Sequence, residues 1–236
     1  MNRISTGIAE LDTLLDGGFP EGSSILVKGP PGGLKTIMAL QFLQAGAAKG
    51  QRGAYVLFNQ SVDGVLEQAS QFGWEFPKLP VNFIEFNTYR DFDIEAGIVG
   101  AVKEGGASRL VVDSLSSFLS RPPIARESFE GDRLLESLRQ MPNLGITEEM
   151  LVRSFTTRLL RRVAETRATA LYVYEDGTLE GIRSTCEYLV DGVIRLAKLE
   201  TTGKRTLTVE KMRYTKHDFL PRNMILTERG IRVEMR

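Results

Sequence analysis

The chain has 236 residues, of which 42% are hydrophobic and 25% are charged. These values are ordinary for a soluble globular protein of one or two domains. Lysine plus arginine and aspartate plus glutamate both number 30, so the formal net charge is zero. A balanced charge disfavours a protein that coats nucleic acid or an anionic membrane.

Cysteine and histidine are scarce. Cys186 is the only cysteine and His217 the only histidine. An internal disulfide is therefore impossible, and a histidine-based metal site is nearly excluded. We expect Cys186 to be a small, half-buried side chain rather than a nucleophile. The N-terminal residues lack the apolar core of a signal peptide, and no window approaches the roughly 18 apolar residues of a transmembrane helix. We therefore expect a cytoplasmic protein with no membrane partner.

Short apolar runs alternate with amphipathic stretches through most of the chain. The apolar runs predict strands at 23–28, 54–58, 81–86, 110–113 and 170–174. The amphipathic stretches predict helices at 37–48, 62–72, 94–103 and 148–166. Ser61 and Thr147 are the expected N-caps of the second and fourth helices. This order predicts an α/β fold with a mostly parallel central sheet and helices on both faces.

The C-terminal part of the chain changes to antiparallel patterning. Residues 192–199 and 205–213 alternate apolar and polar side chains around Thr202-Gly203, which predicts a β-hairpin. A second C-terminal β-hairpin is predicted over 224–233, with its turn near Arg229-Gly230.

One segment does not fit this alternation. Residues 121–145 contain Pro122-Pro123, several charges and Pro142-Asn143. Long connections of this kind often run over the surface and carry function. We therefore expect a single domain over 1–236 in which 121–145 is a surface insertion.

A candidate phosphate-binding loop joins the first predicted strand to the first predicted helix. Residues 29–36 read Gly-Pro-Pro-Gly-Gly-Leu-Lys-Thr. They match the P-loop pattern G-x-x-x-x-G-K-[ST], except that Leu34 replaces the glycine before the lysine. In such loops, backbone N–H groups and the positive end of the helix dipole bind phosphate oxygens. Lys35 would neutralise the β- and γ-phosphates of ATP, and the Thr36 hydroxyl would be a ligand of Mg²⁺.

The loop has a simpler interpretation, in which a Gly/Pro turn only connects strand to helix. Its position between a buried strand and an amphipathic helix favours phosphate binding instead. Leu34 would crowd the phosphates unless its side chain points back into the core. We assign nucleotide binding to Gly32, Gly33, Leu34, Lys35, Thr36 and Ile37.

Asp113 ends the predicted strand at 110–113. Open α/β sheets bind their ligands at the carboxyl edge of the strands, and a carboxylate there is the Walker B position. Such a carboxylate would hold the water shell of Mg²⁺. The alternative is that Asp113 caps the next turn together with Ser114. The position at the sheet edge favours the first interpretation, so Thr36 and Asp113 form the predicted metal site.

The strongest family signal precedes the loop. The pattern T-G-h-x-x-L-D-x-x-L-x-G-G-h-x-x-G is matched by Thr6-Gly7-Ile8, Leu11-Asp12, Leu15, Gly17-Gly18 and Gly22. This lead-in resembles that of the RecA/RadA/KaiC superfamily, and most closely that of KaiC-like ATPase domains. Three later segments resemble the F-G-W, D-G-V-I and K-M-R-x-T-x-H segments of that family: Phe72-Gly73-Trp74, 191–194 and 211–217. The resemblance covers nearly the whole chain and implies a RecA-like P-loop NTPase.

The resemblance also implies a homo-oligomer. KaiC-like domains form rings, commonly hexamers, with ATP between the subunits. Lys211 and Arg213 match residues that reach across this interface to the neighbour's phosphates, in the manner of an arginine finger. Met212, Thr215 and His217 match positions that line the nucleotide. The alternatives are solvated charges on an edge strand for Lys211 and Arg213, and a partly buried, satisfied imidazole for His217.

One departure from the family concerns catalysis. KaiC-like enzymes follow the second strand with paired glutamates, one of which activates the attacking water, and Asn59 and Gln60 match them here. An amide cannot accept a proton, and general-base help is worth about 10²–10⁴-fold. Glu175, at the end of a predicted strand, is the stronger candidate for a substitute acid, and Asp63, expected in the first turn of a helix, is the weaker one. The candidate catalytic residues are therefore Lys35, Asn59, Gln60 and Glu175.

Three functions are compatible with these residues. The chain is an active ring-forming ATPase, or a regulatory or assembly module that binds ATP or ADP and signals its state to an unknown protein partner, or a recombinase-like DNA-binding protein. We favour the second function, with Mg²⁺ and with weak or absent hydrolysis. The balanced charge disfavours DNA binding. The cluster of arginines at 158, 161, 162 and 167 does not favour it either, because these side chains are expected to form a solvated helix face.

Overall fold

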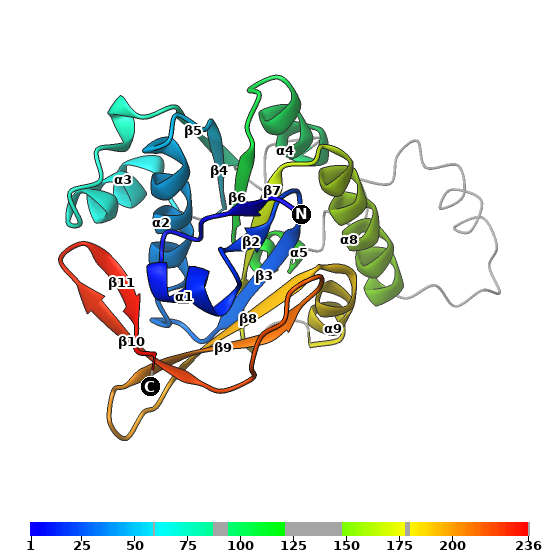
Figure 1. Cartoon of the computed structure of the whole chain (residues 1–236). Helices are drawn as coiled ribbons and strands as arrows, with labels where there is room; N and C mark the ends of the chain where they lie inside the picture. The colour runs from blue at the N-terminus through cyan, green and yellow to red at the C-terminus, as the bar shows by residue number, and fades with distance from the viewer. Residues whose placement is uncertain (59, 87–93, 121–147, 178–179, 236) are drawn as a thin grey trace, which may run out of the picture.

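The computed structural model describes residues 1–58, 60–86, 94–120, 148–177 and 180–235. Its centre is a nine-stranded sheet with the strand order β11-β10-β9-β8-β3-β7-β6-β4-β5 (Figure 1). The strands are β3 (Ser24–Gly29), β4 (Gly53–Phe58), β5 (Val81–Phe86), β6 (Arg109–Asp113), β7 (Thr169–Glu175), β8 (Gly192–Lys198), β9 (Arg205–Met212), β10 (Arg222–Thr227) and β11 (Gly230–Val233). A small second sheet pairs β1 (Arg3–Ile4) with β2 (Phe19–Pro20).

The sheet has a parallel part and an antiparallel part. Strands β5, β4, β6, β7, β3 and β8 run parallel to one another. Strands β9, β10 and β11 continue the sheet in antiparallel pairs beyond β8. The predicted parallel sheet and the two predicted C-terminal hairpins are therefore confirmed, and the structure joins them edge to edge.

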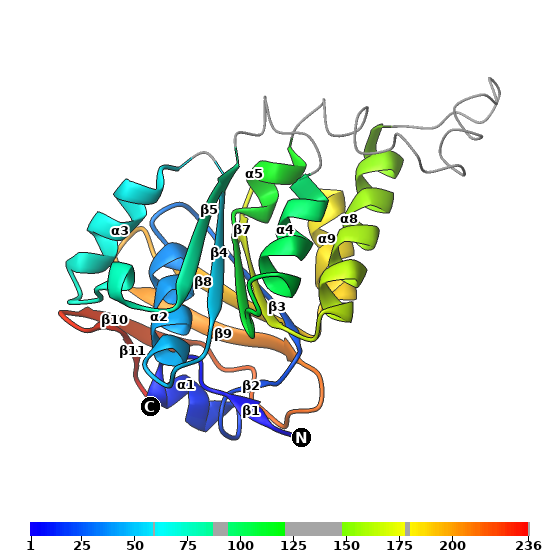
Figure 2. The ribbon, with the colours of Figure 1, turned by 90° about the horizontal axis from the view of Figure 1, so that it is seen from above.

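Helices cover both faces of the sheet, as predicted (Figure 2). One face carries α1 (Ala9–Leu14), α2 (Lys35–Ala47) and α3 (Val62–Ser70). The other carries α4 (Ile94–Lys103), α5 (Leu115–Leu119), α8 (Glu148–Glu165) and α9 (Glu180–Leu189). A short 3₁₀ turn, η1 (Phe76–Lys78), precedes β5. Ser61 caps α3 by accepting a hydrogen bond from the Gly64 amide, as expected.

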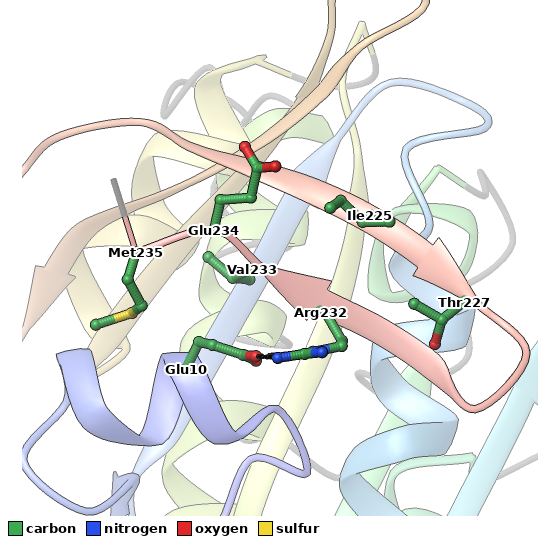
Figure 3. Close-up of a pocket in the computed structure, with 7 residues that line it drawn as sticks. All are labelled: Glu10, Ile225, Thr227, Arg232, Val233, Glu234 and Met235. Atoms are coloured by element: carbon green, nitrogen blue, oxygen red, sulfur yellow. Dashed lines mark hydrogen bonds and ion pairs between the residues drawn. The ribbon is translucent and has the colours of Figure 1, made fainter.

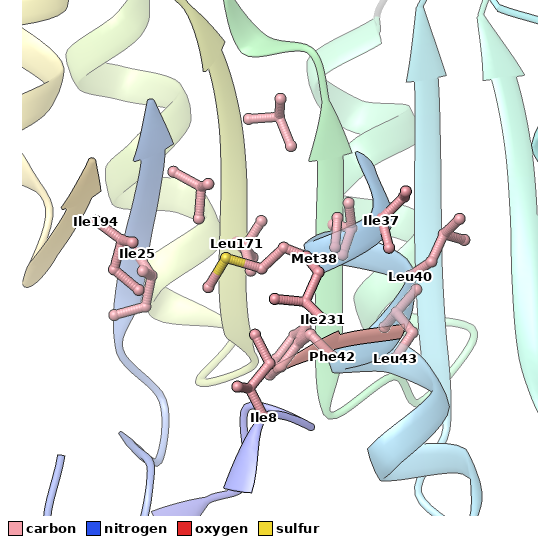
Figure 4. Close-up of a cluster of buried hydrophobic side chains, with 14 of the residues drawn as sticks. Ile8, Ile25, Ile37, Met38, Leu40, Phe42, Leu43, Leu171, Ile194 and Ile231 are labelled. Atoms are coloured by element: carbon pink, nitrogen blue, oxygen red, sulfur yellow. The ribbon is translucent and has the colours of Figure 1, made fainter. Parts of the chain in front are cut away.

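Helix α2 is buried nearly all round, which explains its continuous apolar sequence. Met38 and Leu40 are fully buried among the side chains of the sheet (Figure 4). Ile8 from the N-terminal segment and Ile231 from β11 belong to the same cluster. Burial of each such side chain stabilises the fold by about 1.5–3 kcal/mol. The helix that begins at the candidate loop is thus held from two sides.

The N-terminal lead-in has a structural role. Asp12 accepts hydrogen bonds from the Thr6 amide at 2.7 Å, the Thr6 hydroxyl at 2.7 Å and the Ser5 hydroxyl at 2.6 Å. The buried Arg109 guanidinium donates to the Ser5 carbonyl at 2.8 Å and to the Phe42 carbonyl at 2.6 Å. These bonds fasten the N-terminal segment to the start of β6 and to α2.

Gln41 links three distant segments through one amide. Its Nε2 donates to the Gly7 carbonyl at 2.7 Å and to the Ile231 carbonyl at 3.1 Å. Its Oε1 accepts from the Ile231 amide at 2.7 Å. Gly7 has φ +86°, and a Cβ there would lie 2.5 Å from the Gln41 carbonyl oxygen. The contact therefore requires glycine at position 7.

Two expectations about α8 and α9 need correction. Arg161, Arg162 and Arg167 are exposed, as expected for a solvated helix face, whereas Arg158 is half-buried. Arg158 and Arg162 are not merely solvated, because they pair with the buried Glu95 of α4 at 2.9 and 2.7 Å. Cys186 is fully buried rather than half-buried, and burial raises the pKa of its thiol to about 12. The predicted cap Thr147 and the predicted insertion 121–145 lie outside the described residues.

Within the described part of the chain, no helix combines the length and the apolar character that crossing a bilayer requires.

Candidate functional site

The loop between β3 and α2 adopts a backbone suited to close approach of an anion. Gly32 has φ +72°, and a Cβ built there would meet no atom within 4 Å. Leu34 also lies in the left-handed region, with φ 70° and ψ 21°. This region favours glycine and costs another residue about 1–2 kcal/mol, which is why the P-loop pattern has glycine here. Helix α2 then begins at Lys35, and the first-turn amides of a helix have no partner within it.

The Leu34 side chain packs toward the core and does not fill the space in front of the loop. It is half-buried and packs against the hydrophobic cluster on the α2 face of the sheet. Although Leu34 contributes to the wall beside the loop, it leaves a hollow of about 380 Å³ in front of it. Ligand pockets of roughly 300–1,000 Å³ are typical for small molecules and cofactors.

This hollow collects most of the predicted P-loop and sheet-edge residues. It is lined by Pro31, Gly32, Gly33, Leu34, Lys35, Thr36, Ile37, Phe58, Gln60, Gln68, Asp113, Ser114, Ser117 and Glu175. The set combines a helix N-terminus, a buried ammonium, a hydroxyl and a carboxylate, which is a donor set suited to a polyphosphate with Mg²⁺.

Lys35 presents a buried ammonium at the floor of the loop. Its Nζ donates to the Gly29 and Pro30 carbonyls, both at 2.9 Å, and lies 3.8 Å from Glu175 Oε1. Burial lowers the pKa of Lys35, while the carboxylates of Glu175, Asp113 and Asp176 oppose that shift. The carboxylates thus favour the positive charge that phosphate binding requires.

Thr36 and Asp113 lie together, as the predicted metal site requires. Thr36 Oγ1 donates to Asp113 Oδ2 at 2.8 Å. The hydroxyl of Tyr55 donates to the same oxygen at 2.6 Å. Burial raises the pKa of Asp113, and the hydrogen bonds from Tyr55 and Thr36 oppose it, together with the Lys35 charge. Ser114 rather than Asp113 caps the following helix α5, because its side chain accepts from the Ser117 amide.

The described residues contain no cluster of three or more His, Cys, Asp or Glu side chains that would cage a metal. Mg²⁺ does not need one, because proteins usually bind it through one or two side chains plus substrate phosphates and water. Thr36 and Asp113 therefore fit this ion better than they would fit a structural metal.

The candidate catalytic residues are only partly placed. Gln60 is exposed and lines the hollow, whereas Asn59 lies outside the described residues. Glu175 ends β7 at the same edge of the sheet, and its amide donates to Ser116 Oγ at 3.0 Å. Asp63 lies in the first turn of α3, as expected, and does not line the hollow.

The 211–217 segment does not line the hollow of its own chain. Lys211 Nζ donates to the carbonyls of Glu187, Tyr188 and Val190 at 2.8, 3.1 and 2.6 Å, at the end of α9. Arg213 donates to the Tyr188 carbonyl at 3.2 Å and lies 3.4 Å from Asp191 Oδ1. Strand β10 pairs only with residues 205–207 of β9, so Lys211 lies on a stretch of β9 that pairs with β8 alone. The alternative of charges on an edge strand therefore holds for the strand, and Arg213 is exposed, but both side chains bind groups at the end of α9.

The remaining residues of that segment have different environments. Met212 is 4% exposed and belongs to the hydrophobic cluster on the α2 face. Thr215 Oγ1 accepts a hydrogen bond from Arg3 at 2.6 Å. His217 is half-buried, and its Nδ1 lies 2.9 Å from the Asp218 carbonyl. Their contact with a nucleotide stays a prediction.

Sequence reasoning missed several residues at the hollow. Tyr55 reaches Asp113 from the neighbouring strand, and Gln68 reaches the hollow from α3. Arg205 of β9 donates to the Gly32 carbonyl at 3.0 Å. Strand register and helix docking bring these residues to the loop, so no local pattern marks them. Ser117 could have been predicted from the sequence, because it follows Asp113 within one helical turn and so lies near the same edge of the sheet.

A second hollow, of about 580 Å³, lies between α1 and the β10–β11 hairpin (Figure 3). Its charged residues include Glu10 and Arg232, whose side chains form an ion pair with each other at 2.6 Å. Ile225, Val233 and Met235 make much of its wall apolar. This hollow has no P-loop, so the candidate site is the one at the start of α2.

Comparison with known proteins identifies the family of this chain. The family model described as "ATPase: KaiC" matches residues 4–148 and 138–236. A UPF0273 protein of Pyrococcus furiosus is 31% identical over 98% of this chain and 93% of its own length. A UPF0273 protein of Thermotoga maritima is 32% identical over 98% of this chain and 95% of its own length.

A solved structure supports the same conclusion. The crystal structure of a KaiC-like protein from Pyrococcus horikoshii superposes with a TM-score of 0.78 at 28% identity, covering 99% of each chain. The predicted RecA-like fold and the predicted family are therefore both confirmed. The chain belongs to the KaiC family of ATPases, whose members bind nucleotide, typically with Mg²⁺.

Proposed function

We propose that this chain binds Mg-ATP in the hollow at the start of α2 and works as a nucleotide-dependent regulatory or assembly module with slow hydrolysis. The carrying observation is the convergence of Lys35, Thr36 and Asp113 on one hollow of about 380 Å³. Bound Mg²⁺ would supply charge neutralisation for the phosphates. The chain itself would supply the first-turn amides of α2, the Lys35 ammonium and the Asp113 carboxylate.

The expectation of slow hydrolysis rests on the amides at positions 59 and 60. Gln60 lines the hollow, but its side chain cannot take a proton from an attacking water. Positioning and charge stabilisation still contribute to phosphoryl transfer, so the rate would fall without reaching zero. A protein with long-lived bound ATP is suited to signal occupancy, because a ligand stabilises the state it binds by RT ln(1 + [L]/Kd).

We further propose that the active assembly is a homo-oligomeric ring with nucleotide between subunits. Lys211 and Arg213 have donors directed at carbonyls of their own α9 rather than at their own P-loop. Any phosphate they contact in the assembly would therefore belong to a neighbouring subunit's nucleotide, and their donors would exchange these carbonyls for phosphate oxygens. Met212, Thr215 and His217 would then line the nucleotide only in the assembly.

Calorimetry with Mg-ATP and with Mg-ADP tests the binding proposal, followed by mass measurement with and without nucleotide. We expect saturable binding of both nucleotides with a stoichiometry of one per chain, and a larger mass with Mg-ATP. Absence of binding at millimolar nucleotide would contradict the proposed function. Binding without any change of mass would contradict only the ring.

An active ATPase is the second candidate, and one observation favours it. Glu175 lies at the carboxyl edge of the sheet with Oε1 3.8 Å from Lys35 Nζ, so a carboxylate is present beside the hollow. A steady-state phosphate-release assay separates the candidates. Turnover that falls at least about tenfold in Glu175→Gln, with unchanged ATP affinity, would favour Glu175 as the substitute base.

A further inference from the structure

The hydroxyl of Tyr55 makes a contact that sequence reasoning did not anticipate. Tyr55 lies in β4, which pairs in parallel with β6 so that Leu57 is opposite Asp113 and Tyr55 is opposite Val111. Residues two apart share one face of a strand. Tyr55 therefore projects from the same face of the sheet as Asp113. It lies two residues further from the carboxyl edge of the sheet, and its long side chain extends to the Asp113 carboxylate.

The ring of Tyr55 is held by packing. Tyr55 is fully buried, and its ring stacks on Phe83 of β5 with centroids 5.4 Å apart and an interplanar angle of 14°. Phe83 is in turn held edge-on by Phe76 at 5.4 Å. A buried aromatic ring in such a stack has little rotational freedom, so the position of its hydroxyl is set by packing.

The hydroxyl donates to Asp113 Oδ2 at 2.6 Å, and Thr36 Oγ1 donates to the same oxygen at 2.8 Å. Thr36 would turn its hydroxyl oxygen toward Mg²⁺ on nucleotide binding, and its hydrogen bond would have to adjust. Tyr55 has no such second task. The hydrogen bond from Tyr55 would therefore keep the Asp113 carboxylate in its orientation while the hydrogen bond from Thr36 adjusts.

We propose that Tyr55 is a positioning residue that fixes the Asp113 carboxylate beside Thr36, at the metal-binding side of the hollow. This inference rests on the proposed Mg-ATP site and adds a residue to it. Tyr55 itself touches neither nucleotide nor metal. Its effect is confined to the metal-dependent part of nucleotide affinity, because the loop amides and Lys35 contact the phosphates without it.

The test compares Tyr55→Phe with wild type. The dissociation constant for ATP is measured by calorimetry with saturating Mg²⁺ and again with EDTA. The constant in EDTA divided by the constant in Mg²⁺ reports how much the metal contributes to affinity. We expect the ratio to fall about tenfold in Tyr55→Phe, which is the value of one charge-assisted hydrogen bond. We expect the affinity in EDTA to stay within about twofold of wild type, since no phosphate contact is lost. A weaker Mn²⁺ affinity of the ATP complex, followed by electron paramagnetic resonance, gives a second readout.

Tyr172→Phe is the matched control. Tyr172 is also fully buried in a central strand, but it belongs to the hydrophobic cluster on the opposite face of the sheet. Its loss of a hydroxyl should leave the ratio unchanged. An unchanged ratio in Tyr55→Phe, or an equal loss in the control, would overturn the inference and leave the proposed function standing. Absence of ATP binding by the wild-type protein would overturn both.

Discussion

The loop at 29–36 and the segment at 211–217 both carry cations expected to contact phosphate, yet the fold treats them differently. Lys35 lies on the floor of a hollow that the same chain completes with Thr36 and Asp113. Lys211 and Arg213 instead hold the carbonyl end of their own α9. In the proposed assembly, the first region is a nucleotide site within a single subunit, whereas the second would contact phosphate only in a second copy of the chain. Binding and turnover should therefore respond to different substitutions.

The largest effect is expected from Lys35→Ala. Loss of the ammonium removes the main cation of the loop, so ATP affinity should fall on the order of a thousandfold, as for two charge-assisted hydrogen bonds. Calorimetry measures the change. Lys49→Ala, at an exposed position just after α2, is the control and should bind as wild type does. Retained affinity in Lys35→Ala would show that the loop does not cradle phosphate.

The next largest effect concerns turnover alone. Introducing Asn59→Glu together with Gln60→Glu restores the paired acids of the family, so phosphate release should rise about a hundredfold, the lower part of the range for general-base help. ATP affinity should change little. Asn59→Asp with Gln60 unchanged tests whether a shorter acid suffices. No gain from the double glutamate would mean that Leu34 or the subunit interface limits the rate.

The 211–217 segment should affect turnover without affecting binding by the separate subunit. Arg213→Ala should lower phosphate release about tenfold, because a charge-assisted contact with the transferring phosphoryl is lost. Arg229→Ala, at the exposed turn of the last hairpin, is the control. Equal loss of ATP affinity and turnover in Arg213→Ala would place this residue at its own subunit's nucleotide and contradict the proposed division of roles.

Lys211 should also contribute to stability. Its ammonium donates to three carbonyls at the end of α9, so Lys211→Met, which keeps most of the aliphatic stem, should lower the free energy of unfolding by about 1 kcal/mol. Urea denaturation gives the value. Lys204→Met, in the exposed β8–β9 turn, should change it by less than about 0.5 kcal/mol. A stability equal to wild type would mean that these hydrogen bonds exchange freely with water.

The smallest effect is expected for chemical labelling of Cys186. Because the folded protein should not be labelled there, labelling distinguishes variants that have lost their fold from variants that have lost only their site. The thiol is fully buried and its pKa is raised to about 12, so at pH 8 it is protonated and inaccessible. Iodoacetamide should label it only after unfolding in urea, as read by mass spectrometry. Any variant above whose cysteine is labelled without urea has lost its fold rather than its site. Rapid labelling of the wild type would contradict the burial of α9.

Most of the fold was predictable because its signals are local. Strand β4 is a continuous apolar run and β6 centres on one, and α4 has both a periodic pattern and a glycine stop. Helix α1 was missed because six residues are too few for periodicity, and hydrogen bonds to Asp12 help hold the segment before it. Helix α9 was missed although Ile182, Cys186 and Leu189 form an apolar stripe that could have revealed it.

The site residues that directly follow a predicted strand could be predicted from the sequence. The residues whose contacts depend on the register between two strands could not. The P-loop and Asp113 are adjacent to predicted strand ends, so their meeting follows from a parallel sheet. The contact from Tyr55 requires the register of β4 against β6, which no single segment specifies. Conversely, the role of Glu95 with Arg158 depends on how α4 packs on α8, so the charges looked solvated in the sequence.

The Gln41 amide has a consequence for synthesis of the protein. It joins Gly7, near the start of the chain, to Ile231, near its end, through the helix that begins at Lys35. A ribosome releases Gly7 and Gln41 long before Ile231. The nascent P-loop helix therefore lacks one wall of its core until Ile231, 190 residues after Gln41, has left the ribosome.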